Sequence, residues 1–261
     1  MEPGFWIVEY LSAGLFTGAF GGLLGLGGAI ILIPIMTLVF GLPFHVAITV
    51  ALINNVAVSL SAVLRYNRSG LMHKNVVLAM NAGSIPGIVI GVAIASQSPE
   101  NAIKIFYGLF LLSMIALSVW GRGSQSSDPV KEPETFDRPG HTMLGFFMGT
   151  LGGLLGIGGG GLAVTAQVHF FKTHIKNAIA NSSGTIVVAS AFGAIVYLLL
   201  GTFDASSEAL ITAALIVPGS VIGARLGAGI TERLPAKHIK YIFNFTLLYI
   251  AYNMIKSGMG W

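Results

Sequence analysis

Two glycine clusters are the residues of this chain whose spacing could bind a ligand. They read GAFGGLLGLGGAIILIP from Gly18 to Pro34 and GTLGGLLGIGGGGLAV from Gly149 to Val164. Each glycine inside a helix costs about 1 kcal/mol relative to alanine, so we predict that the helix breaks at both clusters. A helix that restarts there presents free N–H groups and the positive end of its dipole, which together attract an anion. The residues predicted to form this site are Gly25, Gly27, Gly28, Gly158, Gly159 and Gly160. The alternative is that the glycines serve only as a hinge or as packing positions between helices.

Polar side chains inside apolar segments are the second set of candidates. Amides and hydroxyls donate hydrogen bonds to an oxyanion without carrying charge, which suits weak, reversible binding. The candidates are Asn54, Asn55, Asn181, Ser182 and Ser183. Arg225 is added because a guanidinium fork matches an oxyanion. Their alternatives are hydrogen bonds between helices for the amides and hydroxyls, and extension to the membrane surface for Arg225.

The composition predicts a membrane protein around these candidates. The chain has 54% hydrophobic and 9% charged residues, against about 25% charged residues in a soluble domain. Its apolar stretches cover 5–42, 45–64, 76–95, 103–120, 142–171, 178–200, 209–230 and 241–257. Most have the roughly 20 residues needed to cross a bilayer, and the two longer ones contain the glycine clusters. Residues 1–11 carry no positive charge, so we expect no cleavable signal peptide.

The chain contains two copies of one unit. Gly27 and Gly158 are 131 residues apart, as are Ser59 and Ser190, and Tyr66 and Tyr197. We therefore divide the chain into an N-terminal repeat at 1–120, a polar linker at 121–141 and a C-terminal repeat at 142–261.

Loop charges indicate that the two copies face opposite ways. The loop after the second apolar segment carries Arg65, Arg68 and Lys74 in the first copy, but Asp204 and Glu208 in the second. By the positive-inside rule we predict inverted repeats, each a broken hairpin plus three transmembrane helices, giving 8–10 membrane segments. Both termini then lie outside the cell and the linker lies in the cytoplasm. The alternative is eight simple spans with parallel copies.

The paired glycine motifs, the central linker and the paired Pro-Gly segments at Pro86-Gly87 and Pro218-Gly219 resemble the sulfite exporter TauE/SafE family of permeases. The resemblance covers essentially the whole chain. It implies a multi-pass protein of the cell inner membrane that transports sulfite, an organosulfonate or a related sulfur-containing anion.

No Asp or Glu lies in the middle of an apolar segment to carry a coupling proton or sodium ion. A dianion leaving a cell gains about 4.6 kcal/mol from a potential of 100 mV, so we predict export by alternating access. The alternatives are a passive anion channel and a permease for another small solute. We expect no enzymatic activity, no cofactor, no metal and no nucleic-acid partner, because the sequence shows no motif for them and no cysteine. The expected partners are the anion, the lipid bilayer and a second copy in a homodimer.

Overall fold

The computed structural model describes the backbone of residues 3–24, 27–120, 136–201, 203–231 and 236–260, and every regular element in these ranges is helical. This confirms the predicted all-α class. The elements are α1 (Pro3–Leu24), α2 (Ala29–Pro34), the π-helix η1 (Ile35–Val39), α3 (Phe44–Arg68), α4 (Lys74–Gln97), α5 (Glu100–Trp120), α6 (Arg138–Leu155), α7 (Gly160–His169), α8 (Ile175–Leu200), α9 (Phe203–Thr231) and α10 (Ala236–Gly258). Six of the predicted apolar stretches correspond to one helix each, 142–171 corresponds to α6 and α7, and 5–42 corresponds to α1, α2 and η1.

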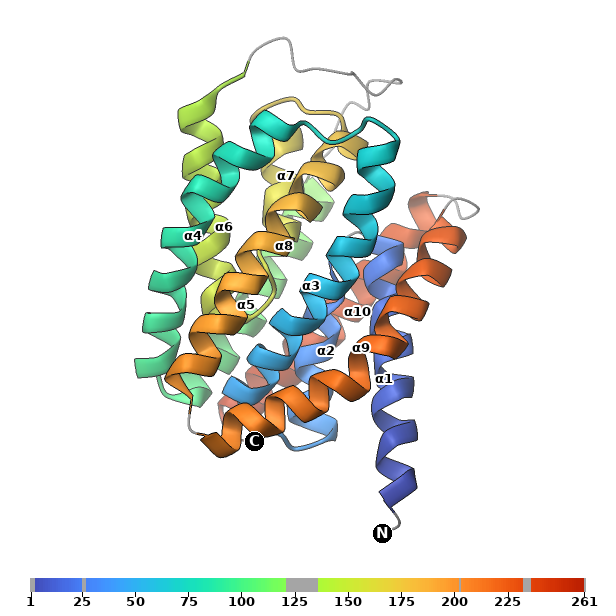
Figure 1. Ribbon diagram of the computed structural model, residues 1–261, viewed down its shortest axis with the longest axis vertical. Coiled ribbons are helices and arrows are strands. Elements are labelled where there is room, and N and C mark those ends of the chain that lie inside the picture. Colours follow the sequence, from blue (N-terminus) through green and yellow to red (C-terminus); the bar gives the residue numbers. More distant parts are fainter. Residues whose placement is uncertain (1–2, 25–26, 121–135, 202, 232–235, 261) are drawn as a thin grey trace.

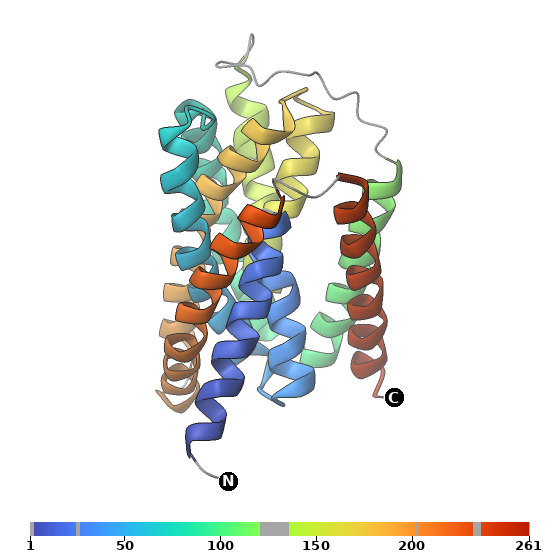
Figure 2. The same ribbon diagram turned by 90° about the vertical axis from the view of Figure 1, so that its right-hand side faces the viewer.

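The helices form an elongated bundle, with both chain termini at one end (Figures 1 and 2). We call this the terminal end, and the opposite end, where α5 finishes and α6 begins, the linker end. Helix α1 runs from the terminal end into the bundle, and α2 with η1 returns to that end (Figure 2). Helix α6 starts from the linker end, and α7 returns to it (Figure 1). Both broken hairpins therefore point into the middle of the bundle from opposite ends.

Part of the predicted linker is helical. Residues 121–135 lie outside the described residues, but α6 begins at Arg138, within the predicted linker at 121–141. The side chain of Asp137 caps this helix by accepting a hydrogen bond from the Gly140 N–H at 3.0 Å. Pro139 lies in the first turn, where a backbone N–H has no partner within the helix, so its missing N–H costs no hydrogen bond. Both are ordinary signals for a helix start, and they outweigh the polar, loop-like composition of this stretch.

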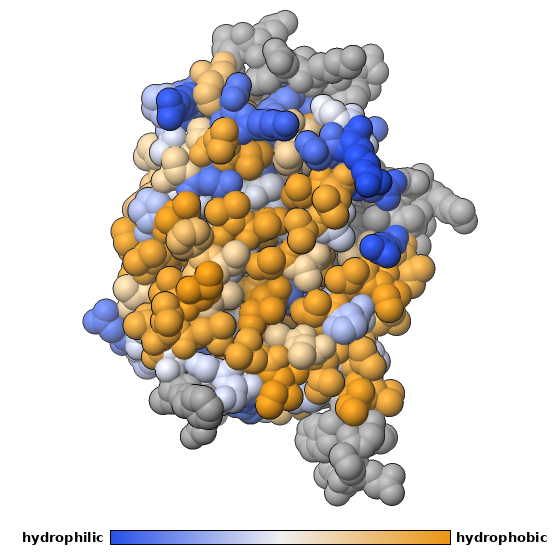
Figure 3. Space-filling view, viewed as in Figure 1, coloured by the Kyte–Doolittle hydropathy of each residue, from blue (hydrophilic) through white to orange (hydrophobic). Residues whose placement is uncertain are grey.

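The bundle surface is that of a multi-pass membrane protein. Among the described residues, four helical stretches are long and apolar enough to cross a bilayer, namely Phe44–Arg68, Lys74–Gln97, Lys176–Leu200 and Ala205–Gly227. A broad hydrophobic belt covers the middle of the face shown in Figure 3, and hydrophilic groups gather at the linker end. Large apolar side chains such as Leu78 and Leu199 are exposed on this exterior, as expected where lipid is the solvent.

Glycine stripes form two close seams between the halves of the chain. At every glycine of these stripes, an added Cβ would collide with the backbone of the facing helix. Glycine therefore lets the paired helices approach closely. In one seam α4 faces α6, and in the other α1 faces α9. The glycines concerned are Gly83, Gly87, Gly91, Gly145, Gly149 and Gly153 in the first seam and Gly14, Gly18, Gly219, Gly223 and Gly227 in the second. Each broken hairpin is thus held by a helix from the other half.

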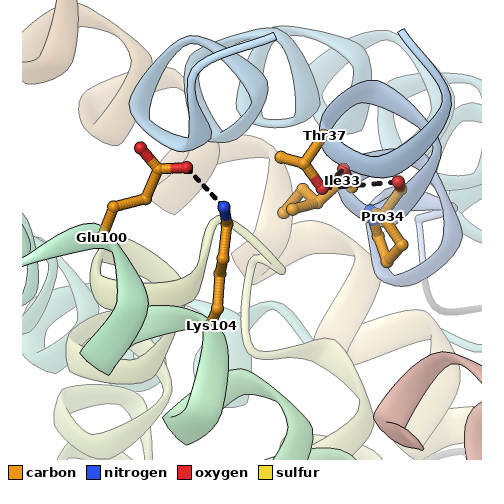
Figure 4. Close-up of polar contacts among 5 residues, drawn as sticks. All are labelled: Ile33, Pro34, Thr37, Glu100 and Lys104. Atoms are coloured by element: carbon orange, nitrogen blue, oxygen red, sulfur yellow. Dashed lines mark hydrogen bonds and ion pairs between the residues drawn. The ribbon is translucent and has the colours of Figure 1, made fainter. Parts of the chain in front are cut away.

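The return of the first hairpin changes from α-helix to π-helix after Pro34. Thr37 follows one turn later, and its hydroxyl donates to the Ile33 carbonyl at 3.0 Å and to the Pro34 carbonyl at 3.3 Å (Figure 4). In the same view, Lys104 and Glu100 form an ion pair of 2.7 Å within the first turns of α5. Such an i,i+4 pair stabilises α5 itself by only about 0.3–0.5 kcal/mol and does not connect α5 to the hairpin.

A tyrosine replaces the backbone donor that Pro34 lacks. In a continuous helix the N–H of residue 34 would bond the carbonyl of Ile30, but proline has no N–H. The hydroxyl of Tyr107, which is fully buried on α5, donates to the Ile30 carbonyl at 3.0 Å. Helix α5 therefore anchors the first turn of α2 next to the glycine break.

We expect Tyr107→Phe to lower the free energy of unfolding by about 1–3 kcal/mol, because it leaves a buried carbonyl unpaired. Adding Pro34→Ala is expected to recover much of this loss, since the new N–H at residue 34 can bond the Ile30 carbonyl. Thermal unfolding of both single variants and the double variant measures this coupling. Strictly additive losses would show that the tyrosine hydroxyl does not substitute for the missing donor.

Candidate functional site

The helix is interrupted at both glycine clusters, as the sequence predicts, and each break contains two consecutive glycines in the left-handed region. Gly27 and Gly28 have φ of 82° and 81°, and Gly158 and Gly159 have φ of 67° each. This left-handed region costs an L-residue with a side chain about 1–2 kcal/mol, which explains the glycines at these four positions. Gly160 is the first residue of α7, and Gly25 lies outside the described residues.

Each break leaves backbone donors without a helical partner. The first N–H groups of a helix have no carbonyl one turn earlier to bond, and this holds for the starts of both α2 and α7. Neither helix has a side-chain cap at this position. The start of α7 lies in the interior of the bundle, where Gly158, Gly159 and Gly160 are buried. Backbone donors and the positive end of the α7 dipole therefore face inward.

Asn55 on α3 lies between the two breaks. A Cβ placed on Gly27 would stand 2.6 Å from its Oδ1, and a Cβ placed on Gly158 would stand 3.1 Å from its Nδ2. A serine hydroxyl also lies beside each of these glycines. The Cβ position on Gly27 is 3.7 Å from Ser59 Oγ, and the Cβ position on Gly158 is 3.1 Å from Ser190 Oγ. We use the name central site for Gly27, Asn55, Ser59, Gly158, Gly159, Gly160 and Ser190, together with Asn54, which precedes Asn55 on α3.

The amides of the central site are buried and unpaired. Asn54 and Asn55 are both 0% exposed, and neither Nδ2 nor Oδ1 of either side chain has a hydrogen-bond partner. The buried hydroxyl of Ser190 is unpaired as well. Each unsatisfied buried polar group costs about 1–3 kcal/mol, and such groups are rare in folded proteins. Their concentration beside two helix breaks is what a site completed by a polar ligand requires.

The central site lacks a full charge among the described residues. No described Lys, Arg, Asp or Glu is buried, and no group of three or more described His, Cys, Asp and Glu could hold a metal ion. Arg225 lies on α9 with its side chain exposed, so the structure does not bring it together with the asparagines. The donors of the central site are therefore neutral amides, hydroxyls and backbone N–H groups.

Asn181 and Ser182, also predicted as site residues, belong to a bonded network nearer the linker end. Asn181 accepts a hydrogen bond from the His73 N–H at 2.8 Å and donates to Gln167 Oε1 at 3.1 Å. Gln167 donates in turn to the Ser182 hydroxyl at 3.0 Å. Asn177 adds a bond to the Leu71 carbonyl at 2.9 Å, so α8 holds the turn between α3 and α4. We call these residues the linker-end network.

Ser183 is also accounted for by local structure, since its hydroxyl donates to the Ile179 carbonyl at 2.8 Å within α8. The predicted polar set is thus divided by the structure. Asn54 and Asn55 have free bonding capacity, whereas both ends of the Asn181 amide and the hydroxyl of Ser183 are already paired.

A pocket of about 250 Å³ opens near the terminal end. It is lined by residues of α3, α4, α8 and α9, among them His45, Thr49, Ser96, Tyr197 and Ser206. Asn54 lies five residues beyond Thr49, which is roughly 7.5 Å farther along the axis of α3. The pocket and the central site are therefore successive positions along the same helix.

In the sequence, Ser59 and Ser190 are placed at equivalent positions of the repeat but are not selected as site residues. The repeat carried the signal that could have found them. Each serine is 131 residues from the other, and each lies beside the glycine that opens the break of its own half. A single serine in a membrane helix usually donates its hydroxyl to a carbonyl of the preceding turn, so a serine alone does not indicate a binding site.

The sequence profile of the family described as "Sulfite exporter TauE/SafE" matches residues 10–254. The chain belongs to the sulfite exporter TauE/SafE family. The family is one of membrane transporters, and it is not a class of enzymes.

Three curated relatives show how the similarity is distributed. The chain is 28% identical to "Probable membrane transporter protein MamO" of Paramagnetospirillum magneticum over 96% of its own length, but it spans only 45% of that protein. It is 28% identical to "Probable membrane transporter protein YunE" of Bacillus subtilis, with 94% of this chain and 96% of that protein covered. It is 25% identical to "Probable membrane transporter protein MJ0441" of Methanocaldococcus jannaschii, covering 90% of each. No solved structure matches this TauE/SafE protein.

Proposed function

We propose that the protein exports a small sulfur-containing anion, sulfite or an organosulfonate, across the inner membrane of the cell. The observation that carries this proposal is the fully buried, unpaired side chain of Asn55 between the two glycine breaks, next to the equally buried and unpaired Asn54 on α3. Together with the free N–H groups at the start of α7, they offer convergent donors of the kind that hold an oxyanion. The family description supplies the sulfur chemistry.

The anion crosses by alternating access between two inverted repeats. Three features support the inversion: left-handed glycine pairs recur 131 residues apart, the two hairpins enter from opposite ends, and the seams pair α1 with α9 and α6 with α4. A midplane site between inverted halves is the usual arrangement for transport by rocking of one unit against another.

Charge supports an orientation with the linker inside the cell. Exposed basic residues at the linker end are Arg65, Arg68, Lys74, Arg138, Lys172 and Lys176, and the described acidic residue there is Asp137. The terminal end carries Glu9, Glu100 and Glu208 beside Lys104 and Lys256. By the positive-inside rule, this distribution of charge favours both termini outside.

The two ends of the bundle support an outward-facing state. At the terminal end, the pocket of about 250 Å³ includes Thr49, which is six residues before Asn55 on α3. At the linker end, the linker-end network ties α7 and α8 to the turn between α3 and α4. An inward-facing state requires these hydrogen bonds to break, while the pocket closes. The membrane potential supplies about 2.3 kcal/mol per 100 mV for each negative charge that leaves the cell.

Sulfite exchange in proteoliposomes tests this proposal. We expect vesicles loaded with unlabelled sulfite to accumulate labelled sulfite transiently above the level found in vesicles loaded with chloride. A carrier gives this counterflow because the loaded site reorients faster than the empty one, whereas a channel does not. Saturable sulfite entry without counterflow would contradict alternating access, and no protein-dependent sulfite flux would contradict the substrate.

A further inference from the structure

We infer that the central site selects a monoanion that brings its own hydrogen-bond donor, and that it rejects a dianion. For sulfite the bound species is then hydrogensulfite. This inference rests on the proposed function, because it assigns the ionisation state of the anion held at that same site. It follows from three properties of the site: its lack of charge, its unpaired acceptors and their arrangement.

The first property is charge. No described Lys, Arg, Asp or Glu is buried, so the donors of the central site are neutral dipoles. The cost of moving an ion out of water grows with the square of its charge, and a dianion therefore pays about four times as much as a monoanion of the same size. Neutral dipoles that suffice for one negative charge do not repay that cost for two.

The second property is the presence of acceptors. Asn54 and Asn55 each carry an amide oxygen that is buried and unpaired. Rotating the Asn55 amide by half a turn exchanges its nitrogen and oxygen but leaves one oxygen between the two breaks in both orientations. An anion that has only acceptor atoms leaves the amide oxygen without a hydrogen bond. The lone pairs of the anion and of the amide oxygen then face each other. A ligand with an O–H group satisfies this oxygen.

The third property is that donors and acceptor lie on opposite sides of Asn55. Its Nδ2 is directed toward Gly158, which adjoins the start of α7 and the hydroxyl of Ser190. Its Oδ1 is directed toward Gly27. A ligand placed here directs its charged oxygens to the α7 side and its proton to the Gly27 side. This matches a small oxyanion in which one oxygen is protonated.

Two tyrosines are the described titratable groups whose side chains bond the backbone next to the breaks. Tyr197 on α8 donates its hydroxyl to the Gly153 carbonyl, and Tyr107 on α5 donates to the Ile30 carbonyl, so both are neutral donors. The buried His141 is in the first turn of α6, roughly 22 Å along that helix from the break at Gly156. On α3, His45 and Arg65 lie toward opposite ends of the helix from Asn55, and on α8 Lys176 is in the first turn. A change of affinity with pH at this site therefore reports the ligand.

Three anions separate the possibilities in a binding experiment on the purified full-length protein. Sulfite takes up a proton near neutral pH, methanesulfonate is a monoanion without a donor, and sulfate is a dianion throughout. Dissociation constants are measured for each at a series of pH values on both sides of the second ionisation of sulfurous acid.

We expect the affinity for total sulfite to be constant while hydrogensulfite predominates and then to fall about tenfold per pH unit as the dianion replaces it. Methanesulfonate is expected to bind at least tenfold more weakly than hydrogensulfite at every pH, and sulfate more weakly still. The methanesulfonate series also corrects for any titration of the protein.

Methanesulfonate binding as tightly as sulfite would overturn the requirement for a donor. Sulfite affinity that is flat or rises with pH, or tight binding of sulfate, would overturn the selection of a monoanion. In both cases the anion site itself would stand. Failure of all three anions to bind would instead contradict the proposed function.

Discussion

Replacing Asn55 with leucine is expected to abolish transport while making the protein more stable. Leucine has nearly the shape of asparagine but needs no hydrogen bonds, so the variant removes two buried, unpaired atoms without opening a cavity. We expect the free energy of unfolding to rise by about 1 kcal/mol in the absence of ligand. Sulfite counterflow is expected to fall by more than tenfold, because the donor beside Gly158 and the acceptor beside Gly27 are both lost. Proteoliposome flux and thermal unfolding of the same preparation measure the two effects.

Asn181→Leu is the matched control for the stability change. It makes the same substitution at another fully buried asparagine, but this amide is bonded at both ends. Its removal leaves the His73 N–H and Gln167 Oε1 unpaired, so we expect stability to fall by about 1–3 kcal/mol. Opposite signs for the two variants would show that Asn55 is held unpaired for function. Undiminished counterflow in Asn55→Leu would remove Asn55 from the site.

Gly158→Ala is expected to stop transport by filling the central site. The new methyl group would lie 3.1 Å from Asn55 Nδ2 and 3.1 Å from Ser190 Oγ, which are the two donors on the α7 side. The backbone at this position has φ of 67°, which adds about 1–2 kcal/mol of strain for alanine. We expect counterflow to fall by more than tenfold and the melting temperature to fall with it.

Gly41→Ala separates the backbone strain from the loss of the site. Gly41 has nearly the same φ of 68°, but nothing lies within 4 Å of the position of a Cβ. The equivalent residue in the other half, Lys172, carries a side chain at φ of 53°, so this turn accommodates one. We expect Gly41→Ala to lose about 1 kcal/mol of stability with unchanged flux. Equal losses of flux in both glycine variants would point to strain rather than to the site.

The helical class, the segment positions and the two breaks were predictable because they depend on local composition. Runs of apolar residues define the segments, and clustered glycines interrupt a helix wherever they occur. The roles of the individual asparagines were not predictable in this way. Asn55 and Asn181 have the same side chain and the same burial, but Asn181 meets the backbone of His73, a residue 108 positions away in the chain.

Arg225 illustrates the same limit. Its place inside an apolar segment made it a candidate, but the direction of a side chain around a helix depends on which neighbours pack against that helix. Because α1 packs along the glycine stripe of α9, that stripe faces inward and Arg225 is exposed. In a lipid-facing helix, hydrophobic periodicity does not show which face is which.

The seams between the halves also set the order in which this chain can mature on the ribosome. The Ser220 hydroxyl bonds the Gly14 carbonyl across 206 residues of sequence, and Gly18 meets the backbone at the same serine. At about 5–20 residues per second, α1 waits roughly 10–40 s after its own synthesis before its partner emerges. During that interval the bilayer holds a broken helix whose glycine face has only lipid against it. A nascent chain halted at the linker has completed neither seam, so the newly made first half depends on the rest of the translation product to reach its final packing.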